Sequence, residues 1–297
     1  LIKTEDPNLE NSIFNLDKLK HLMLLARLDK PIGIFLLLWP TLSALILAAE
    51  GLPETKILVI FVLGTIFMRS AGCVINDFFD QKYDSSVKRT KNRALINKSL
   101  SSKDALLFFI FLIFFSFVLV LQLNKFSIFL SLIALFLAIF YPLTKRFFAI
   151  PQLFLGLAFS MAILMAFTAT KNSIPSEAWL LFVANVFWAL SYDTHYAVTD
   201  LKDDINLPIH SSAKFFGRWT PHFITFNYLL MFLILFYLGF RLGNSILYFL
   251  PLIIALYFAL NGIYFSKKMS PEMNFMAFKK ANLIGFVIFL AFLLEYL

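Results

Sequence analysis

Cysteine and acidic residues are both scarce in this sequence. The single cysteine, Cys73, excludes an internal disulfide. Aspartate and glutamate together number only 18 in 297 residues, and most apolar stretches contain neither. The histidines are few and show no zinc-ligand spacing; they are His21, His195, His210 and His222. The sequence therefore indicates neither a disulfide-stabilised fold nor a zinc site, and any acidic residue beside an apolar run needs an explanation.

Apolar residues make up 60% of the chain, and phenylalanine alone occurs 38 times. They are gathered into repeated runs of about 17–22 residues, the length that crosses a bilayer as a helix. We therefore predict an all-α polytopic membrane protein with nine transmembrane helices. The predicted spans are residues 32–50, 57–76, 105–123, 126–142, 150–170, 177–196, 221–240, 243–264 and 278–296.

The net charge of +8 is distributed very unevenly over the loops between these spans. If the N-terminus lies inside, 21 of the 26 basic residues fall on the cytoplasmic side and four on the other, while Arg69 lies within a span. Cytoplasmic loops carry such an excess of lysine and arginine. We therefore expect a cytoplasmic N-terminus and a C-terminus on the opposite side. The charge reflects topology rather than a nucleic-acid partner.

Residues 1–30 differ in character from the rest of the chain. Acidic residues at Glu5, Asp6 and Glu10 precede the first apolar run, which resembles neither a signal peptide nor a transit peptide. We predict a cytoplasmic amphipathic lead-in over 1–30, followed by a single membrane domain over 31–297. The apolar residues of the lead-in recur at helical spacing, at Leu16, Leu19, Leu22, Met23 and Ala26.

Two acid-rich segments, 76–84 and 193–204, each close a long apolar run. Together they contain seven of the 18 acidic residues. A carboxylate next to hydrocarbon is costly and usually marks a functional site with a counter-ion. Both segments lie at the predicted cytoplasmic ends of their spans and precede the two longest loops, at 80–104 and 200–220. The acids and most of the excess basic charge therefore meet at one membrane face.

The spacing of the oxygen ligands predicts a divalent-metal site. Asn76, Asp80 and Asp84 recur every four residues, which aligns them on one face of a helix. Asp193, Asp200 and Asp204, spaced by seven and four residues, lie on a second such face. Magnesium prefers hard oxygen ligands and commonly joins carboxylates to substrate phosphates. We assign the metal to Asn76, Asp80, Asp84, Asp200 and Asp204, and the catalytic role to the four aspartates among them. The alternative, purely structural interpretation is that these acids only end the helices and face water.

Basic and aromatic residues beside the acidic segments complete the predicted site. We expect five bases to contact diphosphate oxygens, although positive-inside bias alone also explains such residues; they are Lys88, Arg89, Arg93, Lys145 and Lys202. Arg69 lies seven residues before Asn76 on the same helix face, where it either pairs with an aspartate or binds an anionic acceptor. We assign Arg69 and Asp77 to the acceptor. Tyr141, Asp193 and Tyr196 are predicted to support the site or to shield a developing carbocation.

Several stretches resemble a known family. The pattern from Asn76 to Asp84 and the run from Tyr192 to Asp204 resemble the two signature motifs of the UbiA family of intramembrane prenyltransferases. Three further stretches resemble its 4-hydroxybenzoate polyprenyltransferase branch: Arg27–Gly33 with the following Leu-Trp-Pro-Thr, Met68–Cys73, and Tyr141–Arg146 leading into Pro-Gln. The resemblance covers about residues 22–220. Residues 221–297 contain no recognised motif, so we expect them to serve as scaffold.

The resemblance implies nine helices around a central cavity with a cytoplasmic active site. It also implies Mg²⁺-dependent transfer of a polyprenyl group, octaprenyl in the branch it resembles, to the carbon ortho to the phenol of 4-hydroxybenzoate, in ubiquinone synthesis. The expected location is the bacterial inner membrane with the C-terminus periplasmic. The expected partners are these two substrates and the lipid bilayer, with no nucleic acid and no obligatory protein partner.

Two alternative functions are compatible with a membrane protein that carries acidic residues beside its spans. A sister activity of the same family would use another aromatic acceptor, such as a naphthoate, homogentisate or haem. An ion-coupled transporter would place its acids near the bilayer midplane in broken helices. The three stretches that resemble the 4-hydroxybenzoate branch disfavour the sister activity. The transporter is disfavoured because both acidic segments lie at one interface and span 177–196 contains no glycine or proline.

Overall fold

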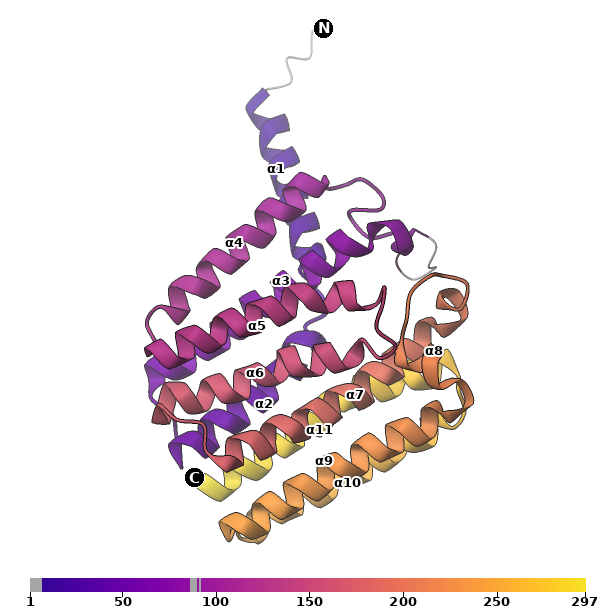
Figure 1. Ribbon diagram of the computed structural model, residues 1–297. Helices are drawn as coiled ribbons and strands as arrows, with labels where there is room; N and C mark the ends of the chain where they lie inside the picture. The colour runs from indigo at the N-terminus through magenta and orange to yellow at the C-terminus, as the bar shows by residue number, and fades with distance from the viewer. Residues whose placement is uncertain (1–6, 86–89, 91) are drawn as a thin grey trace, which may run out of the picture.

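The computed structural model describes residues 7–85, 90 and 92–297, and these form helices and loops without a strand (Figure 1). The α-helices, with one 3₁₀-helix η1, follow each other in the order α1 (Pro7–Leu25), α2 (Ile32–Ala49), α3 (Thr55–Asp84), α4 (Ser102–Val120), α5 (Lys125–Thr144), α6 (Gln152–Lys171), α7 (Ser176–Asp204), α8 (Ser212–Phe216), η1 (Gly217–Trp219), α9 (Thr220–Leu242), α10 (Ile246–Ser266) and α11 (Pro271–Tyr296).

The nine predicted spans correspond one to one with the nine helices α2–α7 and α9–α11 of the described chain. Eight candidate spans in the described residues are long and apolar enough to cross a membrane. One of these spans contains α9 together with α8 and η1. The exception, α7, carries polar side chains that are buried inside the bundle, among them Asn185, Thr194 and His195. The chain is therefore a multi-pass membrane protein. Helices α3 and α7 extend beyond the predicted apolar spans and continue through the acidic segments, as the helical spacing of the acids predicted.

The long helices pack into a closed bundle. Each helix contacts its neighbour in the chain, with α3 also contacting α5 and α7 contacting α9, and α11 closes the bundle by packing against α2 and α7. The largest hydrophobic cluster lies between α2, α6, α7, α9, α10 and α11. Large apolar side chains on the outer faces of α4 and α5 are exposed, for example Phe114 and Phe136. Such a continuous apolar surface suits contact with lipid.

The two ends of the bundle are chemically different. At one end, Lys171 Nζ lies 2.6 Å from Glu50 Oε1, and Arg241 donates to the Ser176 hydroxyl at 2.7 Å. The short loops after α2, α4, α6 and α9 are at this end, near the C-terminus (Figure 1). At the other end lie the ends of α3, α5 and α7, the helix α8, and the long connection between α3 and α4 (Figure 1). Both acidic segments therefore share one end of the molecule, as the sequence predicted.

The lead-in predicted over 1–30 is a helix, α1, followed by a turn into α2. Leu25 is buried in a small hydrophobic cluster with residues of α3 and α4, and Lys18 Nζ lies 2.6 Å from Asp104 Oδ1 at the start of α4. Leu16 and Leu19 remain exposed on the other side. The helix is thus fixed to the bundle along one face and leaves an apolar face uncovered.

Candidate functional site

Both acidic segments line a single large cavity at the end of the bundle. The cavity has a volume of about 1110 Å³ and is open to the outside. Helix α3 extends past its apolar part and brings one asparagine and three aspartates to the cavity, and α7 brings three aspartates. These amide and carboxylate residues at the cavity wall are Asn76, Asp77, Asp80, Asp84, Asp193, Asp200 and Asp204. The structure therefore brings together every amide and carboxylate that the sequence analysis assigned to the metal.

The Asp80 carboxylate is held by a lysine from another helix. Lys145, directly after α5, donates from Nζ to Asp80 Oδ2 at 2.8 Å and to Asn76 Oδ1 at 3.1 Å. Asn76 also donates to Asp80 Oδ2 at 3.1 Å. Burial alone would lower the pKa of the Lys145 ammonium, but the Asp80 carboxylate outweighs burial and raises that pKa above the usual lysine value. Lys145 is therefore a permanent positive charge at the cavity wall.

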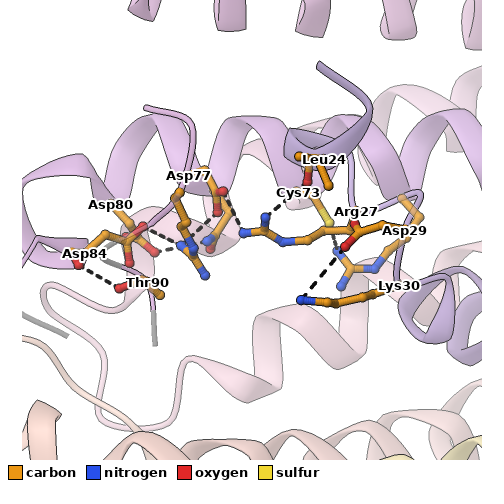
Figure 2. Close-up of polar contacts among 12 residues, drawn as sticks. Leu24, Arg27, Asp29, Lys30, Cys73, Asp77, Asp80, Asp84 and Thr90 are labelled. Carbon is orange, nitrogen blue, oxygen red and sulfur yellow. Dashed lines mark hydrogen bonds and ion pairs between the residues drawn. The ribbon is translucent and has the colours of Figure 1, made fainter. Parts of the chain in front are cut away.

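A second group of ion pairs connects three segments around Asp77 (Figure 2). Arg27 Nη2 lies 2.7 Å from Asp77 Oδ2, and Arg93 Nη1 lies 2.9 Å from Asp77 Oδ1. Arg93 also pairs with the Asp84 carboxylate. Asp77 is almost fully buried, so two arginines balance a charge that would otherwise be costly. The network joins the turn after α1, the loop after α3 and the first acidic segment.

The predicted diphosphate-binding bases fall into three groups. Arg93 and Lys145 line the cavity. Lys202 is exposed and does not line the cavity, because two helix positions separate it from Asp200 and turn it to another face of α7. Lys88 and Arg89 lie outside the residues that the structure describes. The structure thus brings two of the five bases to the acidic segments.

Arg69 lies deeper in the same cavity, on the same face of α3 as Asn76. Its Nη1 donates to Cys73 Sγ at 3.0 Å, its guanidinium carbon is 5.5 Å from the centre of the Phe159 ring, and its buried Nε has no hydrogen-bond partner. Within the described part of the chain no carboxylate forms a salt bridge with Arg69. A half-buried guanidinium whose buried Nε donor is unsatisfied is a place for an anionic ligand. Of the two interpretations of Arg69, the structure favours anion binding over an internal ion pair.

Helix α2 fixes where this guanidinium can lie. Gly33, in the first turn of α2, is so close to Arg69 that a Cβ there would lie 2.6 Å from Nε. Only glycine permits this approach. The close contact explains the glycine at position 33, whose purpose the sequence alone did not reveal.

Aromatic rings line the region between Arg69 and the acidic segments. Tyr141 and Tyr196 are both at the cavity wall, as predicted. The Tyr141 ring centre is 5.8 Å from Lys145 Nζ, and the Tyr196 ring centre is 4.8 Å from that of Phe278. Rings in such positions present negative faces to a cation in the cavity.

Helix α11 contributes more than the sequence analysis expected. Residues 221–297 were expected to be scaffold, but Phe275, Phe278 and Lys279 of α11 line the cavity. His210, in the turn after α7, also lines it. No motif predicted these residues, because α11 reaches the cavity only through tertiary packing against α2 and α7. By contrast, His195 is fully buried and does not line the cavity, and its Nδ1 lies 2.8 Å from Asn274 Oδ1.

The oxygen ligands suit a divalent cation that keeps part of its water. Among the described residues, no three His, Cys, Asp or Glu side chains are already close enough to hold a metal ion by themselves. The positive charges of Lys145 and Arg93 lie against Asp80 and Asp84 instead. Mg²⁺ commonly binds through one or two carboxylates together with waters and substrate phosphates. The ligand types and their shared cavity fit that kind of binding, in which the diphosphate completes the site.

Comparison with known proteins agrees with this architecture. A sequence model of the UbiA prenyltransferase family matches residues 37–292. Two similar proteins are the 4-hydroxybenzoate octaprenyltransferases of Nitrosomonas eutropha and Aliivibrio fischeri. The first is 50% identical over 91% of this chain and 95% of its own length; the second is 48% identical over 93% and 96%.

Solved structures share the fold at much lower sequence identity. A UbiA homolog from Aeropyrum pernix K1 has a TM-score of 0.76 and 19% identity, covering 85% of this chain and 94% of its own. A UbiA homolog from Archaeoglobus fulgidus, bound to DMAPP and Mg²⁺, has a TM-score of 0.68 and 19% identity, covering 90% and 98%. At this identity the likeness demonstrates the fold alone.

Proposed function

This chain belongs to the UbiA prenyltransferase family, and from that membership we propose that it transfers a polyprenyl group from polyprenyl diphosphate to 4-hydroxybenzoate. The new bond joins C1 of the prenyl chain to the ring carbon ortho to the hydroxyl group. The observation that carries the proposal is the single cavity where two acidic segments and a half-buried arginine meet. The names of the two relatives that are about half identical support the acceptor and suggest an octaprenyl donor.

The donor end of the cavity is the end with the acidic segments. We propose that Asn76, Asp80 and Asp84 on α3, with Asp200 and Asp204 on α7, bind Mg²⁺ together with the diphosphate. A divalent cation bound there supplies charge neutralisation for the diphosphate and polarises its allylic C–O bond. Lys145 pairs with Asp80 and Arg93 pairs with Asp84. A diphosphate bound beside these carboxylates would therefore also contact the two basic side chains. Their charge stabilises the diphosphate as it leaves.

The acceptor end is the deeper region around Arg69. We propose that the Arg69 guanidinium binds the carboxylate of 4-hydroxybenzoate and so orients the ring toward the donor. The unsatisfied Nε and the absence of a salt bridge among the described residues support this role. Asp77, assigned to the acceptor from the sequence, is occupied by Arg27 and Arg93, so we propose that it acts by holding Arg27 at the cavity.

The reaction follows from these positions. The bond between C1 and the diphosphate oxygen breaks, and diphosphate departs with the electron pair. The faces of Tyr141 and Tyr196 shield the allylic cation. The phenol ring is already nucleophilic at its ortho carbon, so the acceptor needs no strong base. The displaced ring proton passes to the leaving diphosphate or to an aspartate of the acidic segments.

We further propose the bacterial inner membrane as the location, with the site end of the bundle facing the cytoplasm. The excess of basic residues on the loops at that end supports this orientation. A long isoprenoid diphosphate has its chain in the bilayer and its charged end at the interface. A cavity at the membrane surface therefore suits this donor.

The decisive test is a reaction with purified protein in detergent or lipid. We expect octaprenyl diphosphate, 4-hydroxybenzoate and Mg²⁺ to yield 3-octaprenyl-4-hydroxybenzoate, and a chelator to stop the reaction. An acceptor panel with a naphthoate, homogentisate and haem separates the sister activities, since only 4-hydroxybenzoate should react efficiently. Efficient turnover of another acceptor, or none with any acceptor, would overturn the proposal. Ion-driven solute uptake into vesicles would support the transporter alternative instead.

A further inference from the structure

A lysine of the short helix α8 binds the main chain at the end of the second acidic segment. Lys214 Nζ donates to the carbonyl oxygens of Leu207 at 2.8 Å, Ile209 at 3.1 Å and Asp204 at 3.4 Å. An ammonium group has three N–H donors, and each finds one carbonyl. Asp204 is the last residue of α7 and belongs to the proposed metal site, so this contact lies directly behind the chemistry.

The helix that carries Lys214 is itself firmly attached. The Ser212 hydroxyl lies 2.8 Å from the hydroxyl of Thr194 on α7, and the Ser212 amide donates to Gln152 Oε1 on α6 at 3.0 Å. Ser211 accepts a hydrogen bond from the Lys214 amide at 3.3 Å. Ser212 and Thr194 are fully buried. The ammonium is therefore presented from a fixed support rather than from a free loop.

The end of α7 needs such a cation. The last carbonyls of a helix have no partner within it, and the helix dipole makes them a region of partial negative charge. Many helices end in a glycine in the left-handed conformation, which ties back these carbonyls. Here the residue after Asp204 is Ile205, which keeps a right-handed helical conformation. Lys214 supplies a positive charge there from outside the helix: it donates to the Asp204 carbonyl, which also accepts from the Leu207 amide, and to two carbonyls of the turn that follows.

The turn held by Lys214 also reaches the first acidic segment. The His210 amide donates to the Lys145 carbonyl oxygen at 2.7 Å, and the Lys145 side chain binds Asp80. His210 follows Ile209, one of the three residues whose carbonyls bind Lys214. One short stretch of chain therefore connects the end of α7 to the lysine that holds the facing carboxylate of α3.

We propose that Lys214 is a positioning residue for the metal–diphosphate site. It fixes the turn 204–210 and thereby sets the position of the Asp204 carboxylate relative to Asp80 across the cavity. The three oxygens it binds belong to the main chain, and it forms no salt bridge within the described residues, so its charge does not compete directly for the carboxylates. The role in metal binding rests on the proposed function, whereas the hydrogen bonds from Lys214 to the turn do not depend on it.

The test compares Lys214→Met with wild type by hydrogen–deuterium exchange, which needs no turnover. Exchange in peptides covering 204–211 is followed while Mg²⁺ is titrated with inorganic pyrophosphate present. Partners behind a metal ligand commonly change metal affinity by roughly 10- to 100-fold. We expect faster exchange of this turn without Mg²⁺, and a half-maximal Mg²⁺ concentration for protection raised about tenfold.

Two further variants separate charge, hydrogen bonding and simple loss of stability. Lys214→Arg should restore most of the Mg²⁺ affinity, while Lys214→Gln, which has donors but no charge, should be intermediate and replaces Lys214→Met if that protein does not fold. Lys267→Met removes an exposed lysine at the same end of the bundle and should behave as wild type. In turnover assays, Lys214→Met should raise KM for the polyprenyl diphosphate and leave KM for 4-hydroxybenzoate unchanged.

The possible results are distinguishable. Unchanged exchange over 204–211, or an unchanged Mg²⁺ midpoint in Lys214→Met, would overturn the proposal. So would an equal rise in KM for both substrates, since that indicates a general loss of structure. If wild type protects the turn with Mg²⁺ and pyrophosphate but makes no product from 4-hydroxybenzoate, the proposed function fails while the positioning role stands.

Discussion

The Asp80 carboxylate shows how a single residue depends on distant parts of the chain. Its partner Lys145 lies 65 residues further along the sequence and comes from a different helix. The pair keeps a buried charge stable, and the proposed function gives the same carboxylate a second role as a ligand of the divalent cation. The carboxylate therefore serves both the resting structure and the proposed reaction.

Asp80→Asn keeps the shape of the side chain but removes its charge. We expect kcat to fall by about 100-fold or more, because both the metal and Lys145 lose a charged partner. Asp200→Asn should have a comparable effect from the facing helix. Product formation at saturating substrates measures the loss. Asp17→Asn, which changes an exposed carboxylate on α1, is the matched control, with unchanged turnover expected. Near-normal rates in both site variants would contradict the metal assignment.

Arg69→Leu should weaken acceptor binding selectively. A hydrogen bond to a charged group contributes about 1.5–3 kcal/mol, so KM for 4-hydroxybenzoate should rise by roughly 10- to 100-fold. KM for the polyprenyl diphosphate should stay unchanged. Phenol, which lacks the carboxylate, serves as the matched acceptor: its slow reaction should be indifferent to the substitution. Equal losses with both acceptors would argue that Arg69 has a structural role only.

Pairs of helices fix the site through close approaches that leave no room for side chains. Helix α2 approaches α3 at Gly33, and α11 approaches α7 at Gly285. The first contact sets the position of a guanidinium, whereas the second packs two helices that both line the cavity. Substitutions at these glycines therefore have different expected consequences.

Gly33→Ala should reproduce part of the effect of Arg69→Leu on acceptor binding. The new Cβ would lie 2.6 Å from Arg69 Nε and 2.7 Å from Nη2, and the end of a long side chain moves more easily than two helices. We expect KM for 4-hydroxybenzoate to rise while thermal unfolding in detergent changes little. If unfolding temperature falls sharply and KM does not change, the helices rather than the guanidinium have moved.

Gly285→Ala should destabilise the protein. Its Cβ would lie 2.4 Å from the buried Trp188 ring, and overpacking of this kind costs about 1–3 kcal/mol. Gly64→Ala, in α3, is the matched control because no atom lies within 4 Å of its Cβ position, so the higher helix propensity of alanine should be neutral or stabilising. Thermal unfolding in detergent compares the two. A control as unstable as Gly285→Ala would contradict this account of the packing.

At the scale of the whole molecule, the bundle has two unlike ends and one of them contains all the proposed chemistry. The acidic segments, Lys145, Arg93 and α8 are gathered at this end, and the short loops after α2, α4, α6 and α9 are at the other (Figure 1). The proposed function therefore requires one orientation in the membrane, in which this end faces the side that supplies the charged substrates and the metal.

Thiol labelling tests that orientation. In a Cys73→Ser background, Ser99→Cys at the site end and Leu52→Cys at the other end each introduce one exposed thiol. A membrane-impermeant reagent should label Leu52→Cys in intact spheroplasts. It should reach Ser99→Cys only in inverted membrane vesicles. The reverse pattern would place the site on the periplasmic side and contradict the distribution of basic residues.

Local sequence determined the helices and much of the site. Hydropathy and helical period depend on neighbours a few residues away, so the nine helices α2–α7 and α9–α11 and the shared faces of Asn76, Asp80 and Asp84 were predictable. The resemblance of short stretches to a known family gave the acceptor, which the acids alone did not. The same local reasoning placed the acids on helices that continue past the apolar spans, and α3 and α7 do end at Asp84 and Asp204.

Only the tertiary structure decided which groups meet. It paired Lys145 with Asp80, gave Asp77 two arginines, turned Lys202 away from the cavity and brought Phe278 of α11 into it. These contacts depend on how helices distant in sequence are rotated and packed, and no repeat in the chain encodes that rotation. The sequence by itself specified the chemistry available at one membrane face. The packing of the bundle decided which of those residues share the cavity and which are left outside it.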